Sequence, residues 1–127
     1  MPEPQVFRST VWEAGPKRPT ARVVDYTGQV VTSGDLTGTI ALSVYDLSSS
    51  TSTTSIFDTN RVIGSTVFDS LQPWEVDGTG YNFQDLVTTG EVVLEGGHTY
   101  RLSYRFAGPN GTIPLLFDWR ARGLISV

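Results

Sequence analysis

The stretch LEGGHTYRLSYRF, residues 94–106, contains the clearest structural signal in the chain. From residue 100 onward, apolar or aromatic residues alternate with polar ones, which indicates a strand with one buried and one solvated face. Asn110-Gly111 follows, and this pair favours a tight hairpin turn because both residues tolerate positive φ. The alternation resumes over residues 112–122. We therefore predict a hairpin of strands 98–106 and 112–122 with the following residues facing inward: Tyr100, Leu102, Tyr104, Phe106, Ile113, Leu115, Phe117, Trp119 and Ala121.

Tyr100 lies just inside the first of these strands, directly after a turn that contains Gly96 and Gly97. This placement resembles the tyrosine corner of immunoglobulin-like and fibronectin-like sandwiches, in which a buried ring directs its hydroxyl to a backbone group upstream. The resemblance implies that the Tyr100 hydroxyl reaches back to the residues before the turn.

Further short strands are predicted along the chain at 21–26, 29–31, 39–47, 62–68, 86–87 and 91–94, with a bend at Thr27-Gly28 and a solvated Ser/Thr loop at 48–55. Of these, 39–47 is the candidate for a central strand because Ile40, Leu42 and Val44 alternate with smaller or polar residues. Short strands separated by turn signals every 8–12 residues or so are typical of a two-sheet architecture. The predicted fold is all-β, an immunoglobulin-like antiparallel β-sandwich of about seven to nine strands.

Residues 1–20 contain four prolines and read as an extended N-terminal arm, ahead of a sandwich domain at 21–127. Residues 6–12 of the arm could form a short edge strand because the prolines bracket this segment rather than interrupt it. Two alternatives follow for that strand. It either joins the sheet of its own sandwich or docks on a neighbouring subunit.

The charge of the chain is −4, and it is unevenly distributed. Residues 25–95 hold ten acidic side chains and one basic one, which argues against a nucleic-acid groove. No apolar run approaches the roughly 20 residues that cross a bilayer, and residues 1–4 do not resemble a leader, so no membrane is expected. Four arginines should share the outer face of the hairpin, where they either pair with the acidic middle of the chain or form a patch for an anionic partner: Arg101, Arg105, Arg120 and Arg122.

Catalytic and metal-binding patterns are not found. The only histidine, His98, opens a strand without a Gly-x-Ser-x-Gly nucleophile motif elsewhere, so we predict a structural or solvent-exposed residue. There is no cysteine, and no EF-hand spacing occurs. The carboxylates nearest to a calcium set are Asp69, Asp77 and Asp85, but turns account for them. We predict no cofactor and no enzymatic activity.

One resemblance points to a function. The segments VFDSLQ (67–72), WEVD (74–77), TGYNF (79–83) and GHTYRLSY (97–104) resemble small virion structural proteins of tailed bacteriophages, over about residues 20–120. The resemblance implies a non-enzymatic capsid decoration or cement protein on the capsid surface of the virion. Its partner would be the major capsid protein, with a homo-oligomer also possible.

Six side chains are the candidates for partner binding: Phe7, Trp12, Lys17 and Arg18 in the arm, and Trp74 and Tyr81 in an aromatic, turn-rich crossing. Aromatic residues in such segments anchor protein contacts, although filling the ends of a core is the commoner use. The alternative function is a carbohydrate-binding or host-attachment module in which Trp74 and Tyr81 stack on sugar rings.

Overall fold

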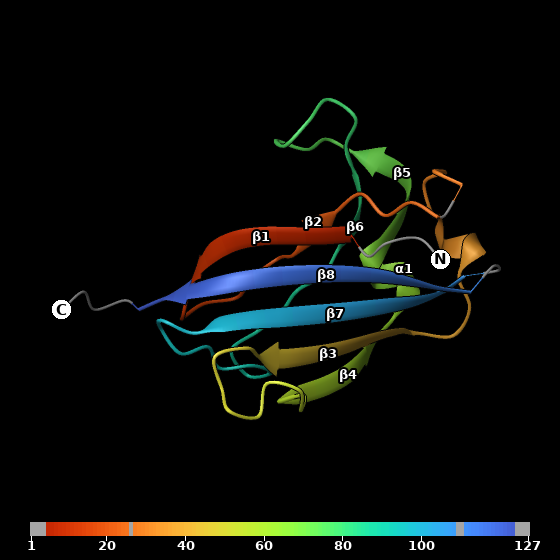
Figure 1. The fold of residues 1–127 in the computed structure, drawn as a ribbon. Coiled ribbons are helices and arrows are strands. Elements are labelled where there is room, and N and C mark those ends of the chain that lie inside the picture. Colours follow the sequence, from red (N-terminus) through yellow and green to blue (C-terminus); the bar gives the residue numbers. More distant parts are fainter. Residues whose placement is uncertain (1–4, 26, 109–110, 124–127) are drawn as a thin grey trace.

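The computed structural model describes residues 5–25, 27–108 and 111–123, and its strands form two sheets (Figure 1). The larger sheet has the order β1 (Gln5–Trp12), β8 (Gly111–Arg122), β7 (Thr99–Gly108), β3 (Ile40–Asp46) and β4 (Phe57–Arg61). The smaller sheet has the order β2 (Thr20–Ala21), β6 (Tyr81–Gln84) and β5 (Val67–Gln72). Two short helical turns, η1 (Ser33–Asp35) and α1 (Ile63–Thr66), lie between strands. The all-β class predicted from the sequence is confirmed.

The predicted hairpin is the central pair of the larger sheet. β7 and β8 pair antiparallel from Thr99 opposite Arg120 to Gly108 opposite Gly111. The inward residues predicted for both strands are all buried, as the alternation required. Gly111 has a φ of 116°, which supports the use of glycine at the turn. Residues 109–110, which complete the predicted turn, lie outside the described residues.

The contact implied by the tyrosine-corner resemblance is present. The Tyr100 ring is buried, and its hydroxyl accepts a hydrogen bond from the backbone N–H of Glu95 over 2.8 Å. This bond fixes the turn to the strand that follows it.

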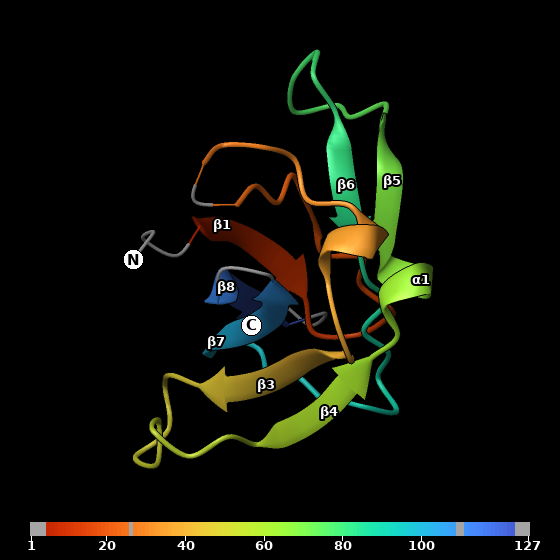
Figure 2. The same ribbon diagram turned by 90° about the vertical axis from the view of Figure 1, so that its right-hand side faces the viewer.

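The core lies between the two sheets, which Figure 2 shows as separate layers. Phe83 of β6 meets Tyr104 and Phe106 of β7 edge-on, with ring centroids 4.9 and 5.4 Å apart. Aromatic pairs favour this arrangement because the positive ring edge faces the negative ring face. The two sheets therefore share one apolar interior.

β3 is an interior strand of the larger sheet, as predicted, with Ile40, Leu42 and Val44 buried. Its neighbour β4 was not predicted. β4 carries a single aromatic residue, Phe57, and its inward side also holds Arg61, which lies opposite Ile40. A charged inward residue masks the alternation by which strands are recognised.

Two predicted strands are wrong. Within 62–68, α1 forms first and β5 begins only at Val67, because the hydroxyls of Ser65 and Thr66 both donate to the Val62 carbonyl over 3.0 Å and favour a helical turn. Within 91–94 the chain turns, since Glu91 N–H and Val92 N–H both donate to the Thr88 carbonyl.

Other predicted strands are shorter than expected. Residue 26 lies outside the described residues, and the rest of segment 21–31 contributes the end of β2 and a bridge between Val24 and Val30 around the predicted bend. The buried Asn82 of β6 holds this segment, because its Nδ2 donates to the carbonyls of Val23 and Val31 and its Oδ1 accepts from Val23 N–H. Segment 86–87 contributes a bridge between Val87 and Lys17.

The predicted strand at 6–12 is confirmed as part of β1, and it joins the sheet of its own chain. β1 forms one edge of the larger sheet and pairs with β8 in parallel, which differs from the antiparallel arrangement expected throughout. The rings of Phe7 and Phe117 stack with their centroids 5.5 Å apart. Side-chain packing as well as backbone pairing therefore joins these two strands, which are far apart in the sequence. Residues 5–20 thus pack on the body of the molecule instead of extending from it as an arm.

Candidate partner-binding groove

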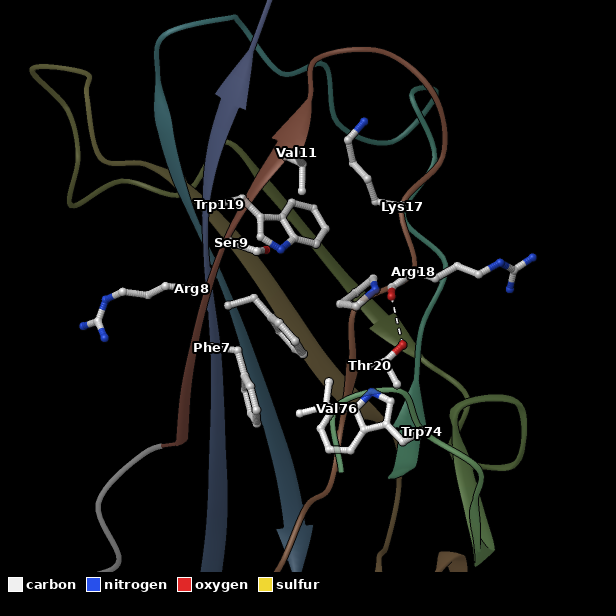
Figure 3. A pocket seen from close by; sticks show the side chains of 12 residues that line it. Phe7, Arg8, Ser9, Val11, Lys17, Arg18, Thr20, Trp74, Val76 and Trp119 are labelled. Atoms are coloured by element: carbon white, nitrogen blue, oxygen red, sulfur yellow. Dashed lines mark hydrogen bonds between the residues drawn. The ribbon is translucent and has the colours of Figure 1, made fainter. Parts of the chain in front are cut away.

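A groove of about 360 Å³ opens at the β1 edge of the larger sheet (Figure 3). It gathers four of the six candidate binding residues, namely Phe7, Lys17, Arg18 and Trp74. The remaining lining residues come from β1, β8, the segment 19–20 that leads into and begins β2, and the loop before β6: Arg8, Ser9, Val11, Pro19, Thr20, Val76, Phe117 and Trp119. Segments far apart in the sequence therefore build one surface.

The floor of the groove is apolar because β1 and β8 both turn their inward side chains to it. Phe7 and Val11 pair in register with Phe117 and Ala121, and Trp119 lies between them on β8. These residues continue the core out to the sheet edge, where the described part of the chain places no further strand beside β1. The smaller sheet covers this apolar face incompletely at Phe7 and Val11, which stay half-buried, whereas the β8 residues of the floor are buried.

One wall of the groove is the segment 17–20, which backbone hydrogen bonds attach to the smaller sheet. Lys17 and Val87 exchange N–H to carbonyl bonds of 2.9 and 2.8 Å, and Asp85 N–H donates to the Pro19 carbonyl over 3.0 Å. Thr20 then pairs with Gln84 of β6. The wall is therefore fixed by the same ladder that builds β2.

The other wall of the groove is the loop 73–80, which carries Trp74. The Arg22 guanidinium lies 6.0 Å from the Trp74 ring centroid and donates to Asp77 Oδ2 over 2.8 Å. Asp77 also accepts from Gly80 N–H, and this hydrogen bond, followed by the one from Arg22, lowers the pKa of the Asp77 carboxyl. These contacts hold Trp74 in place while the neighbouring Val76 stays 70% exposed.

The lining of the groove includes basic residues although the protein is acidic overall. Arg8, Lys17 and Arg18 contribute to the lining, and among the described residues no carboxylate does. Figure 3 shows the side chains of Arg8 and Arg18 pointing away from the groove on opposite sides. Because β1 alternates, the Arg8 side chain belongs to the outer face of the larger sheet, where Arg8 lies opposite Asp118. Lys17 Nζ donates to the Gly15 carbonyl over 2.7 Å, and burial lowers the pKa of its ammonium group.

Trp119 provides an unused donor in the groove. Trp119 is only 3% exposed, and Figure 3 shows its indole among the side chains that line the groove. Within 5–25, 27–108 and 111–123, no group accepts a hydrogen bond from this Nε1–H. Buried indole N–H groups usually have an acceptor, so a ligand that supplies one would gain from this position.

The two other candidate residues lie outside the groove. Trp12 is 55% exposed on the outer face of the larger sheet, with the Arg122 guanidinium 5.5 Å from its ring centroid. Tyr81 is half-buried and contacts the rings of Phe68 and Trp74 edge-on, at 5.7 and 6.3 Å. Trp74 and Tyr81 thus meet at 71° and do not form a flat platform together.

The four arginines predicted for the outer face of the hairpin alternate with its buried residues, as expected. Arg101 pairs with Asp118 on the adjacent strand at 2.8 Å, and Arg105 donates to Ser43 Oγ over 2.9 Å. The acidic partner of Arg101 thus lies within the hairpin itself rather than in the acidic middle of the chain. Arg120 and Arg122 are exposed.

The remaining candidate groups are engaged with the protein. His98 Nδ1 lies 2.9 Å from Asp46 Oδ2, and its Nε2 lies 3.2 Å from Glu95 Oε2. The three calcium candidates have separate partners, since Asp69 accepts from Ser33, Asp77 from Arg22, and Asp85 from Arg61 and Tyr104. In the described part of the chain, no cluster of three or more His, Cys, Asp or Glu side chains is arranged to bind a metal.

Comparison with known proteins assigns no family to this chain. The chain matches no family model, no curated protein and no solved structure. Among the described residues, no helix has the length and apolar character needed to cross a bilayer.

Proposed function

We propose that the protein is a non-enzymatic binding module that attaches to the assembled head of a tailed bacteriophage, as a capsid decoration or cement protein. The observation that carries the proposal is the groove, which unites Phe7, Lys17, Arg18 and Trp74 on one open surface. Aromatic side chains in a hollow, with arginine nearby, are the usual anchors of protein contacts.

In this proposal the partner is the major capsid protein, and the site of action is the capsid surface of the virion. The groove is small by comparison with a stable protein interface, which buries about 800 Å² on each partner. Attachment therefore depends on many copies acting on one shell, so that a modest contact is repeated across neighbouring capsomers. The two sheets, packed on one core, supply a rigid body for such a contact.

We also propose that the fold belongs with immunoglobulin-like sandwiches. Two observations support this grouping, the Tyr100 contact at the turn before β7 and a core shared by two facing sheets. The parallel pairing of β1 with β8 is then a local departure at one sheet edge.

Co-sedimentation of the purified protein with phage heads tests the function. Trp74→Ala removes an aromatic wall of the groove and should abolish binding, whereas Trp12→Ala removes a tryptophan from the outer face and should leave it intact. Because both variants lose the same side chain, a difference between them reports on the groove. Equal binding by both variants, or no binding of the unaltered protein to any head, would contradict the proposal.

The carbohydrate alternative is less well supported by the geometry, since the rings of Trp74 and Tyr81 meet edge-on. A glycan array on the isolated protein separates the two functions. Sugar binding that is lost in Trp74→Ala would favour the carbohydrate module over capsid attachment.

A further inference from the structure

We infer that the groove receives an extended acidic peptide segment, which adds to the free edge of β1 as a strand and inserts an apolar side chain beside Phe7 and Trp119. The inference rests on the proposed function and names the chemistry of the partner. Three features of the groove carry it, namely the open strand edge, the apolar hollow next to it and the basic residues of its lining.

The first feature is the backbone of β1. A parallel ladder uses the N–H and C=O groups of alternate residues. Glu13 N–H donates to the Arg122 carbonyl over 2.9 Å, so by the period of two the odd-numbered residues of β1 bond to β8. The N–H and C=O groups of Arg8 and Thr10 then point to the open side, where the described chain places no strand. Such an edge is a template for strand addition.

The second feature is the hollow beside that edge. Successive side chains of an added strand point to opposite faces, so every second one would enter the space between the two sheets. There it meets Phe7, Val11 and Trp74, which are apolar or aromatic. Trp119 Nε1–H, buried and without an acceptor among the described residues, is placed to donate to a carbonyl or carboxylate of the segment.

The third feature is the charge of the lining. Arg8, Lys17 and Arg18 line the groove of a protein whose net charge is −4, and among the described residues no carboxylate does, although the Arg8 side chain points away to the outer face. Complementary charge speeds the encounter and rejects basic segments. The matching partner is therefore a strand-forming segment with an aromatic or aliphatic residue flanked by aspartate or glutamate.

Peptide binding followed by nuclear magnetic resonance tests the inference on the full chain. The probe is a short capped peptide of threonine and valine with one central phenylalanine and two flanking aspartates. We expect its addition to shift the amide signals of Arg8 and Thr10 and the indole N–H signal of Trp119. Replacing both aspartates with lysine, or methylating the backbone nitrogens that face β1, should weaken binding about ten-fold. No shift at these positions, or equal binding of the methylated peptide, would overturn the inference.

Two variants sharpen the result. Thr10→Pro removes an N–H that points away from β8, a position at which edge strands tolerate proline, and should weaken the peptide about ten-fold. Lys17→Gln should weaken it a few-fold, while Arg120→Gln, on the outer face, should not. Thermal unfolding verifies that Thr10→Pro is folded. If it is not, the methylated peptide makes the same test on the unaltered protein.

The outcomes separate this inference from the proposed function. Head binding that is lost in Trp74→Ala but unchanged in Thr10→Pro would retain capsid attachment and refute strand addition. Peptide binding with the expected shifts, in a protein that attaches to no head, would retain strand addition and refute capsid attachment.

Discussion

The hydroxyl of Tyr104 donates a hydrogen bond to Asp85 Oδ2 over 2.6 Å, and this bond joins the larger sheet to the chain that leaves the smaller one. Asp85 is also 2.9 Å from Arg61 Nε, and Arg61 pairs in turn with Glu91. The pairing raises the pKa of Arg61, and burial raises that of the Tyr104 phenol, so both groups keep their protons. The network ties three segments together at the margin of the core.

Removing the central carboxylate of this network should destabilise the fold. Asp85→Ala leaves Arg61 partly buried with one acceptor fewer and Tyr104 without its acceptor, so we expect a loss of about 3 kcal/mol in the free energy of unfolding. Tyr104→Phe should cost about 1 kcal/mol, because it removes one hydrogen bond and keeps the ring. Urea unfolding measures both. A change below about 0.5 kcal/mol for Asp85→Ala would contradict this account of the network.

Asn82 replaces strand pairing for the segment 22–31, and its removal should be costly. Asn82→Ala leaves Val23 N–H and the carbonyls of Val23 and Val31 without their side-chain partner inside the protein, so we expect a loss of about 3 kcal/mol or more. Hydrogen exchange should show the largest loss of protection in 22–31. Gln84→Ala, on the same strand but half-exposed, is the matched control and should cost far less. Similar unfolding free energies for the two variants would argue against the assignment.

Gly80 should resist substitution while its neighbour Gly78 does not. Gly80 has a φ of 110°, and a Cβ there would lie 2.4 Å from the Gln72 carbonyl oxygen, whereas a Cβ at Gly78 would meet nothing within 4 Å. We expect Gly80→Ala to cost about 2 kcal/mol and to weaken groove binding, because the loop that carries Trp74 must shift. Gly78→Ala should change neither. Thermal unfolding and head binding of the pair measure this. Equal effects would show that the loop conformation does not position Trp74.

The stability should fall in acid. Hydrogen bonds from Arg101 lower the pKa of Asp118, and those from Arg61 lower the pKa of Glu91. A carboxyl whose folded pKa is depressed stabilises the protein above its unfolded pKa, near 4, and loses that contribution as the pH falls through the folded pKa. We therefore expect constant stability from about pH 7 to 5 and a decline below about pH 4.

Urea midpoints across this range measure the acid decline. Asp118→Asn removes one of the responsible groups, so its curve should be flatter in acid than that of the unaltered protein. A curve of identical slope in the variant would show that Asp118 contributes nothing to the pH dependence.

The sequence predicted those parts of the fold that are encoded locally. The hairpin of β7 and β8 follows from alternation and a turn signal within one segment. The pairing of β1 with β8 joins the two ends of the chain, and no local pattern specifies a partner at that distance. β4 escaped prediction because its inward Arg61 finds carboxylates outside the strand, at Asp85 and Glu91.

The candidate site was predicted by residue type but not by place. Phe7 and Trp74 were predicted as binding residues because they are aromatics in proline-rich or turn-rich segments, and the groove contains both. Phe117 and Trp119 were assigned to the core alone, since their alternation cannot show that the core continues to an open sheet edge. Trp12 faces the other way because β1 alternates, a consequence that the strand prediction already contained.

Cryo-electron microscopy of phage heads incubated with the protein tests the proposed function most directly. We expect the protein on the outer surface of the shell, with a segment of the major capsid protein lying along β1 and filling the groove between Phe7 and Trp74. Heads that remain bare, or a contact made through the outer face of the larger sheet with the groove empty, would contradict the proposal.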